Sequence, residues 1–348
     1  MRALTYAAFG GPITLAELPD PTPPPGGAVV RVHATGLCRS DWHAWAGHDE
    51  DITTLPHVPG HEFAGEVEAV GAGVDPAWLG RSVTAPFVQA CGRCEECRRG
   101  NGQVCPQQRQ PGFTDPGSFA ELVIVHAAQT NLVALPEGLS PAVAAGLGCR
   151  VATSYRAIAH RARVQAGEWV AVFGCGGVGL AAIAVAASRG ARVVAVDASP
   201  GPLALARTAG AEVALLARAT TVDEVVACTD GGADVTVDAV GAVTILRDAV
   251  LALRRRGRHV QVGLLPPAAG RPEVPMGRVI GWELDILGSH GMAAQDYPEL
   301  LSELMTGRLS LAALGAPAEP MSLAQAASAL PLIGTSPSMG LQVADPRR

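Results

Sequence analysis

The stretch WVAVFGCGGVGLAAIAVAASRGARVVAVD, residues 169–197, decides the fold class of this chain. It has the pattern of a buried strand, a glycine-rich turn, a helix that ends near Gly190, and a second strand that ends at Asp197. Strand-like and helix-like runs continue to alternate as far as about residue 290. This alternation predicts an α/β domain with a doubly wound parallel sheet.

The glycine-rich turn has the pattern G-x-G-x-x-G, placed between a strand and a helix. Gly174 makes the tight turn, Gly176 lets the pyrophosphate of a dinucleotide approach the backbone, and Gly179 lets the helix pack on the strand. The first helical residues, Gly177 and Val178, then turn their unpaired N–H groups toward the phosphates. The turn therefore predicts a dinucleotide site.

Asp197 supports this interpretation, because it ends the next strand, eighteen residues after Gly179. A carboxylate there accepts hydrogen bonds from the adenosine ribose hydroxyls and repels a 2′-phosphate, which favours NAD over NADP. The alternative is a strand–turn–helix unit that binds nothing. Within the turn, Cys175 is expected to be a small packing residue.

The composition excludes several classes of protein. The net charge is −6 and the arginines are scattered, so we expect no nucleic-acid surface. All 26 basic side chains are arginine, which excludes Schiff-base chemistry, Walker A phosphate binding and tyrosine–lysine carbonyl reduction. An enzyme of alcohols or carbonyls with this composition must polarise oxygen with another group.

The eight cysteines are expected to be reduced thiols or metal ligands. The start MRALTYAAFGG has no signal-peptide block and no segment has the pattern of a membrane helix, so we expect a cytoplasmic protein without membrane contact. Four cysteines follow C-x₂-C-x₂-C-x₇-C, whose last gap is too long for a bacterial ferredoxin. A closed site of four thiolates suits a structural zinc, and a loop without metal is the alternative. These cysteines are Cys91, Cys94, Cys97 and Cys105.

A second set of candidate ligands comprises Cys38, His61 and Cys149. Any one of them alone would more often be a core residue. Together they make two thiolates and an imidazole, and three protein ligands with one open position are typical of catalytic zinc. Zinc in such a site acts as a Lewis acid on an alcohol or carbonyl oxygen.

Over nearly its whole length the chain resembles the zinc-dependent alcohol dehydrogenases of the medium-chain dehydrogenase/reductase family. The segment from Cys38 to His43 fits C-[RH]-[ST]-D-x-H, and the cysteine quartet is a further match. The most specific match is G-H-E-x-x-G-x₅-G-x-x-V, met by Gly60, His61, Glu62, Gly65, Gly71 and Val74.

The resemblance implies a fold and an activity. We expect a GroES-like β-rich catalytic domain made of residues 1–150 and 290–348, with a Rossmann domain at 151–289 inserted between its parts. The implied activity is hydride transfer between NAD and a primary or secondary alcohol, or the matching aldehyde or ketone. Two zinc ions per chain, one catalytic and one structural, and a homodimer or homotetramer are also implied.

The resemblance also implies roles for residues around the catalytic zinc. Ser40 relays the proton of the alcohol through the nicotinamide ribose to His43 and solvent. Asp41 orients His61 and fixes its tautomer. Glu62 is the family acid that ligates the metal transiently, or else completes a local hydrogen-bond network.

Further positions align with residues that contact cofactor or substrate. Arg39 aligns with a pyrophosphate contact and Thr153 with a residue that packs on the nicotinamide, while Val262 and Ser289 stand where the family's backbone holds the carboxamide. The candidate substrate-pocket residues are Trp42, Trp45, Asp49 and Phe87, and Asp49 could equally be a solvated loop carboxylate.

One departure from the family concerns the cofactor. Many members carry a basic residue near the end of the chain that meets the pyrophosphate, where this sequence has Met339 and Leu341. We therefore expect one cationic contact to be missing and NAD to bind more weakly than in a member with that arginine.

Other functions remain open. Polyol and amino-alcohol dehydrogenases of the same family commonly have glutamate as the third ligand, whereas Cys149 favours the alcohol branch. A zinc-free quinone reductase would lack these ligands. A non-catalytic zinc-stabilised nucleotide-binding protein would have a broken catalytic set.

Overall fold

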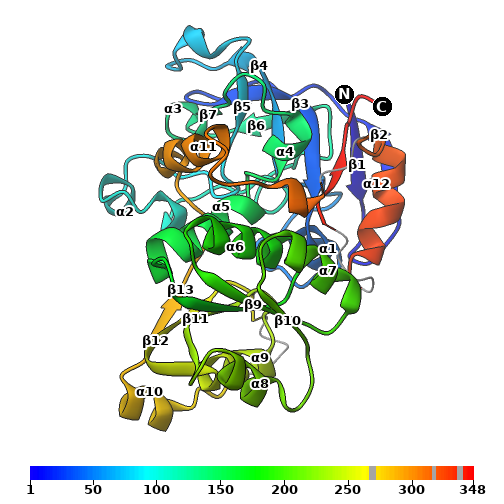
Figure 1. Ribbon diagram of the computed structural model, residues 1–348. Helices are drawn as coiled ribbons and strands as arrows, with labels where there is room; N and C mark the ends of the chain where they lie inside the picture. The colour runs from blue at the N-terminus through cyan, green and yellow to red at the C-terminus, as the bar shows by residue number, and fades with distance from the viewer. Residues whose placement is uncertain (266–271, 316–318, 335–339) are drawn as a thin grey trace.

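The protein, described by a computed structural model over residues 1–265, 272–315, 319–334 and 340–348, is built on two large sheets. In Figure 1 the antiparallel sheet occupies the upper part of the molecule and the parallel sheet the lower part. The functional residues gather where these two parts meet.

The antiparallel sheet has the order β14-β3-β4-β5-β7, and β6 pairs with the other end of β3. Because β14 pairs with β3, the end of the chain joins a sheet that is otherwise formed before residue 135. A separate hairpin is formed by β1 (Arg2–Tyr6) and β2 (Ile13–Glu17). The strands of the main sheet are β3 (Ala28–Leu37), β4 (Phe63–Val70), β5 (Ser82–Thr84), β6 (Leu122–Val125), β7 (Val133–Ala134) and β14 (Gln342–Ala344).

The second sheet is wholly parallel, with the order β10-β9-β8-β11-β12-β13, which confirms the predicted doubly wound sheet. The strand order reverses between β8 and β11, and in such sheets ligands bind at the carboxyl ends of the strands beside this reversal. The strands are β8 (Trp169–Phe173), β9 (Arg192–Asp197), β10 (Val213–Leu216), β11 (Ala233–Asp238), β12 (Leu253–Gln261) and β13 (Asp285–Gly288).

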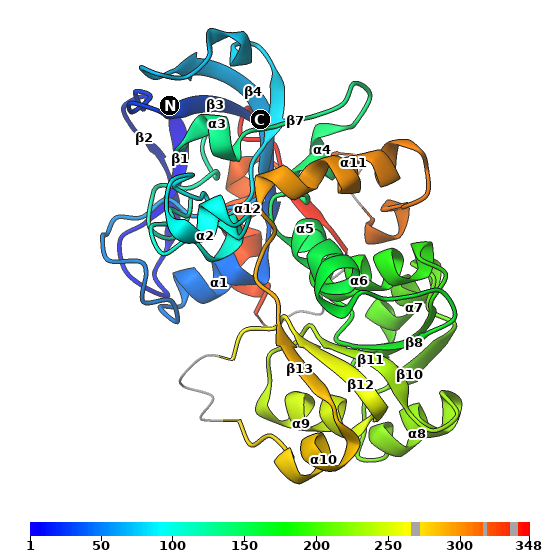
Figure 2. The ribbon, with the colours of Figure 1, turned by 90° about the vertical axis from the view of Figure 1, so that its left-hand side faces the viewer.

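Alternate residues of β8 pack on opposite faces of the parallel sheet, as its pleat requires. Val170 and Val172 belong to the large core that includes α6, while Ala171 and Phe173 pack with residues of α8 and α9. Figures 1 and 2 show α5 and α6 on the side of the antiparallel sheet and α8 and α9 on the far side. Burial of both faces explains why WVAVF is apolar at every position.

The helices of the parallel-sheet part are α6 (Gly177–Ser188), α7 (Pro200–Thr208), α8 (Thr221–Cys228), α9 (Val243–Leu251) and α10 (Met276–Trp282). The others are α1 (Arg39–Trp45), α2 (Glu95–Arg98), α3 (Ala128–Asn131), α4 (Pro141–Ala145), α5 (Arg150–Tyr155) with a π-helical continuation over Arg156–Ala162, α11 (Tyr297–Met305) and α12 (Leu323–Ala329). Within the described residues, no helix is long and apolar enough to cross a membrane.

Candidate active site

Two of the candidate ligands are brought together by the pairing of β3 with β4. These strands are antiparallel neighbours, and Thr35 of β3 pairs with Phe63 of β4. The end of β3 therefore lies beside the start of β4, which places Cys38 close to His61. Cys149 joins them from the N-terminal end of α5, where it is the capping residue.

These side chains form a buried group with the chemistry of a metal site. The ligand atoms of Cys38, His61, Glu62 and Cys149 all lie within 4.8 Å of one another. The Nε2 atom of His61 is buried and has no hydrogen-bond partner among the described residues. A buried nitrogen left in that state costs free energy, so a cation held beside the two thiols fits the site.

The two thiols of this group are themselves coupled. The neighbouring thiol of Cys149 and the imidazole of His61 lower the pKa of Cys38 against the effect of burial. The neighbouring Cys38, together with burial, raises the pKa of Cys149. One thiolate is thus favoured before metal binds, and zinc binding requires loss of the remaining thiol proton.

Asp41 holds the imidazole of His61 in place. Its Oδ1 lies 2.8 Å from His61 Nδ1, and its Oδ2 accepts the backbone N–H of Cys38 at 2.8 Å. The predicted contact between Asp41 and His61 is therefore present. Because Nδ1 donates to the carboxylate, Nε2 keeps its lone pair for a metal.

Glu62 is engaged by a residue that sequence reasoning missed. Arg150 Nε donates to both carboxylate oxygens of Glu62, at 3.0 and 2.8 Å, and the Arg150 backbone N–H donates to Oε1 at 2.8 Å. Burial raises the pKa of Glu62, although Arg150 opposes this. Glu62 would have to give up hydrogen bonds to Arg150 before it reached a metal as an additional ligand.

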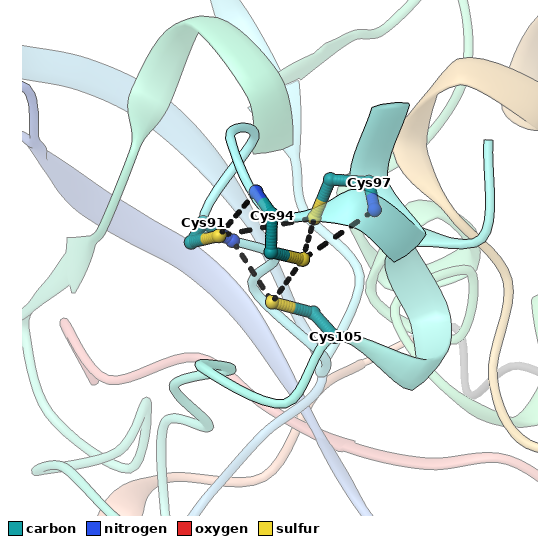
Figure 3. A group of neighbouring side chains, drawn as sticks. All are labelled: Cys91, Cys94, Cys97 and Cys105. Atoms are coloured by element: carbon teal, nitrogen blue, oxygen red, sulfur yellow. Dashed lines mark hydrogen bonds between the residues drawn. The ribbon is translucent and has the colours of Figure 1, made fainter. Parts of the chain in front are cut away.

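The cysteine quartet converges on one point (Figure 3). The sulfur of Cys94 lies 3.3 Å from that of Cys97 and 3.8 Å from that of Cys105, and the sulfurs of Cys91 and Cys97 are 3.9 Å apart. Sulfurs bound about 2.3 Å from one tetrahedral zinc lie about 3.8 Å apart. The separations fit such an ion, and all four cysteines are free of disulfides.

Backbone groups of the same loop prepare these sulfurs for a cation. The N–H groups of Cys91 and Gln107 donate to Cys105 Sγ at 3.4 and 3.3 Å. A backbone hydrogen bond from Arg93 lowers the pKa of Cys91 to about 6. These donors favour thiolates, whereas burial raises the pKa of Cys97 and of Cys105, so zinc binding must displace protons from those thiols.

The glycine-rich turn borders a cavity of about 520 Å³ at the carboxyl ends of β8 and β9. Gly179 packs so closely on the turn that a Cβ atom there would collide with the carbonyl of Gly174. Asp197 lines the same cavity, and its oxygens accept the backbone N–H groups of Cys175 at 2.7 Å and Ser199 at 2.9 Å. The cavity is also lined by Gly174, Gly176, Gly177, Val178, Cys38, Arg39 and Arg150.

Comparisons with known proteins agree with this geometry. Residues 24–137 match the family model of the alcohol dehydrogenase GroES-like domain, and residues 177–306 match that of the zinc-binding dehydrogenases. The chain is 32% identical over 310 residues to an alcohol dehydrogenase of Geobacillus stearothermophilus. This alignment covers 89% of this chain and 90% of that protein. The chain belongs to the zinc-dependent alcohol dehydrogenases of the medium-chain dehydrogenase/reductase family.

This alcohol dehydrogenase, the chain of 348 residues, is also similar to two other known proteins. It is 33% identical over 315 residues to a sorbitol dehydrogenase of Halalkalibacterium halodurans, with 87% of this chain and 88% of that protein covered. A crystal structure of an NAD-dependent alcohol dehydrogenase has a TM-score of 0.87 and 30% identity, with 99% of both chains covered. The expected family and fold are thus confirmed, and zinc and NAD are its cofactors.

The residues expected to relay the proton lie on α1 of the dehydrogenase. Ser40 is half-buried, and its hydroxyl has no hydrogen-bond partner among the described residues. His43 is also half-buried, with Nδ1 3.1 Å from Nδ1 of His48. Burial, together with the charges of Arg39 and His48, lowers the pKa of His43.

The four candidate substrate-pocket residues lie in different surroundings. The ring centroid of Phe87 lies 6.0 Å from that of His61. The ring centroid of Phe113, a residue that sequence reasoning missed, lies 5.2 Å from that of His61. Trp42 lies 4.8 Å from His43. Phe87 and Phe113 thus form an aromatic wall beside the metal ligands.

The other two pocket candidates are held by local contacts. Trp45 packs with the cluster around Leu4 and Phe119 and donates its indole N–H to Gly11. Asp49 accepts the backbone N–H of Asp51, and burial raises its pKa. Like Trp42 and Phe87, these two residues line neither of the two cavities found among the described residues.

The residues assigned to the nicotinamide end of NAD lie apart from the 520 Å³ cavity. Val262 and Ser289 line a second cavity of about 630 Å³, together with His290. The hydroxyls of Ser289 and Thr153 are buried without a partner among the described residues. Two unsatisfied hydroxyls are consistent with a ligand that supplies the missing hydrogen bonds.

Proposed function

We propose that this enzyme transfers a hydride between NAD and a primary or secondary alcohol, or the matching aldehyde or ketone. The observation that carries the proposal concerns Cys38, which belongs to the buried metal-binding group and also lines the dinucleotide cavity. One side chain thus borders both the Lewis acid site and the cavity expected to hold the dinucleotide, and hydride transfer requires these two to be neighbours.

Three side chains would hold the catalytic zinc: Cys38, His61 through Nε2, and Cys149. When bound there, zinc supplies a Lewis acid for the substrate oxygen. A lysine cannot take this role here, because the chain contains none. Asp41 keeps the ring of His61 oriented through Nδ1. The aromatic wall of Phe87 and Phe113 packs against this ring.

The proton of the alcohol leaves through α1 in this proposal. Ser40 has a free hydroxyl two residues after Cys38, and His43 lies on the same helix with its ring half-buried. A lowered pKa keeps the His43 ring neutral at physiological pH, so that it can accept a proton and pass it to solvent. The four cysteines of the second group would hold a structural zinc.

Domain division, assembly and location are part of the same proposal. We assign residues 1–150 and 290–348 to the catalytic domain and 151–289 to the Rossmann domain. A homodimer or homotetramer through the Rossmann sheets is supported by β13, an edge strand on which Ile286 is exposed. A cytoplasmic location is supported by the free cysteines.

The experiment is a panel of aliphatic, aromatic and polar alcohols and their carbonyl partners, assayed with NAD(H) and NADP(H) at 340 nm. The panel includes sorbitol and L-threonine, so that the polyol and amino-alcohol alternatives are measured on the same preparation. Zinc content is determined alongside, in wild type and in Cys38→Ser. We expect two zinc ions per chain and turnover of simple alcohols with NAD, falling to one zinc and no turnover in Cys38→Ser. Turnover of none of these substrates by protein with two zinc ions would contradict the proposal.

A further inference from the structure

Arg150 lies where the metal-binding group meets the dinucleotide cavity. It directly follows Cys149, and its partner Glu62 directly follows His61, so this ion pair connects the segments that carry two metal ligands. Arg150 is only 4% exposed. Arginines are rarely buried to this extent unless an opposite charge pairs with them, and Glu62 supplies that charge here. The charge is therefore held in this place by Glu62.

The hydrogen bonds of the Arg150 side chain use only part of the guanidinium. Nε and Nη2 donate to the carboxylate of Glu62. Nη1 has no hydrogen-bond partner among the described residues. An arginine presents five N–H donors in a planar fork, so the Nη1 edge is available to a further acceptor.

The free edge lies against the glycine-rich turn. A Cβ atom at Gly177 would lie 2.5 Å from Arg150 Cδ and 3.3 Å from Nη1. Gly177 is the first residue of α6, so Nη1 stands beside the helix N-terminus. Backbone N–H groups there attract the phosphates of a dinucleotide, and a guanidinium beside them adds a fixed charge and further donors.

The position expected from the family to supply a cation does not do so here. Leu341 is 2% exposed, belongs to the large apolar core, and packs on Gly146, where a Cβ atom would lie 3.2 Å from its side chain. Met339 lies outside the described residues. The neighbours Gly340 and Gln342 line the cavity, and the basic residues that do so are Arg39, which is exposed, and Arg150.

We propose that Arg150 binds the pyrophosphate of NAD through Nη1 while Nε and Nη2 hold Glu62. One buried cation then serves the cofactor and the metal pocket together. In this arrangement the cation comes from α5 instead of the end of the chain, which argues against the weaker NAD binding expected from the sequence; that expectation stays a prediction. The inference rests on the proposed function only in taking NAD as the cofactor.

The consequence for the metal pocket is electrostatic. With zinc cancelling the charge of the two thiolates, Asp41 and Glu62 would leave two negative charges beside the site. Arg150 cancels one of them, and an anionic pyrophosphate could not approach the pocket as readily without it. Arg150 thus binds the cofactor directly and neutralises Glu62 with the same side chain.

The test measures dissociation constants of zinc-loaded protein for NAD, ADP-ribose and adenosine by calorimetry. ADP-ribose keeps the pyrophosphate without the nicotinamide, and adenosine has neither. In Arg150→Met we expect NAD and ADP-ribose to bind about 10- to 100-fold more weakly, with adenosine unchanged, and Arg150→Lys to recover part of the loss. The matched control is Arg258→Met, which removes an arginine paired with Glu168 that lines neither described cavity.

A second variant keeps the test decisive if the unpaired Glu62 of Arg150→Met unfolds the site. The double variant Arg150→Met, Glu62→Gln removes both charges and should show the same loss for NAD and ADP-ribose. Unchanged affinity in it, or equal loss for all three ligands, would overturn the assignment. The proposed function fails separately, if wild-type protein with two zinc ions binds NAD but oxidises no alcohol.

Discussion

Oδ1 of Asp41 lies 2.8 Å from Nδ1 of His61, and both side chains are only 1% exposed. The other oxygen of Asp41 accepts the backbone N–H of Cys38. One carboxylate therefore fixes two of the three proposed zinc ligands, on segments that follow β3 and precede β4. Removing its charge should loosen both.

The variant Asp41→Asn tests this arrangement. An amide has one acceptor oxygen, so either His61 or the backbone of Cys38 loses its partner. We expect about 10- to 100-fold lower affinity for the catalytic zinc, measured by chelator competition, while the structural zinc is retained. Asp51→Asn, at an exposed loop acid, is the control. Equal zinc retention in both variants would show that Asp41 does not hold the site together.

The cysteine quartet predicts a separable structural role. Cys97→Ser should leave one zinc per chain and lower the midpoint of thermal unfolding by at least about 5 °C, because the metal crosslinks this loop in the folded state. Calorimetry and metal analysis measure the two effects. Cys228→Ser, in a half-buried cysteine outside both metal groups, should change neither quantity. An unchanged midpoint in Cys97→Ser would contradict a structural zinc.

Asp197 should decide between the two nicotinamide cofactors. Its carboxylate repels the 2′-phosphate of NADP, so Asp197→Asn should reduce the preference for NAD, as the ratio of kcat/KM values, by about 10²-fold. The single amide oxygen can still accept the N–H of Cys175 in the turn, while the hydrogen bond from the N–H of Ser199 is lost. Asp230→Asn, at an exposed acid in the same part of the chain, should leave the ratio unaltered. A ratio that stays constant in Asp197→Asn would mean that another group excludes NADP.

His43 predicts a pH dependence of alcohol oxidation. The neutral ring accepts the proton, and burial, Arg39 and His48 lower its pKa. Activity should therefore persist as pH falls past the ordinary histidine value of about 6.5 and decline only below it, as the ring becomes protonated. His43→Gln should abolish this decline and reduce kcat by about 10²-fold.

The control for His43 is another histidine whose pKa is also lowered by burial. His33 lies on β3 beside Arg347, and it has no place in the proposed proton path. His33→Gln should leave the pH profile as in wild type. A profile of His43→Gln that matches wild type would remove His43 from the proton path.

Much of the fold was predictable because its signals are local. The glycine-rich turn after WVAVF and the alternation of strands and helices are readable within short windows. The pairing of β14 with β3 is not, because three residues at the end of the chain carry little pattern and join a strand about 300 residues earlier. Only packing of the completed antiparallel sheet determines that register.

The candidate site was likewise predictable in part, where its signals are local, and not where it depends on contacts between distant residues. The residue types in the sequence predicted the three zinc ligands, and the resemblance to the family implied the contact between Asp41 and His61. Arg150 was missed because its burial depends on Glu62, 88 residues away, and a buried arginine looks like a surface arginine in sequence. Trp45 is a pocket candidate because it is an aromatic residue near the motif, and its packing with the cluster of Leu4 depends on contacts that the sequence pattern does not show.

Direct hydride transfer beside the catalytic metal is tested most directly with an alcohol deuterated at its carbinol carbon. Zinc-loaded enzyme is incubated with NAD and this alcohol, and the nicotinamide is analysed by mass spectrometry and NMR. We predict one deuterium at C4 of the reduced ring in wild type, and none in a Cys38→Ser variant that keeps its structural zinc. Reduced cofactor that carries no deuterium, or equal transfer by Cys38→Ser, would contradict the account.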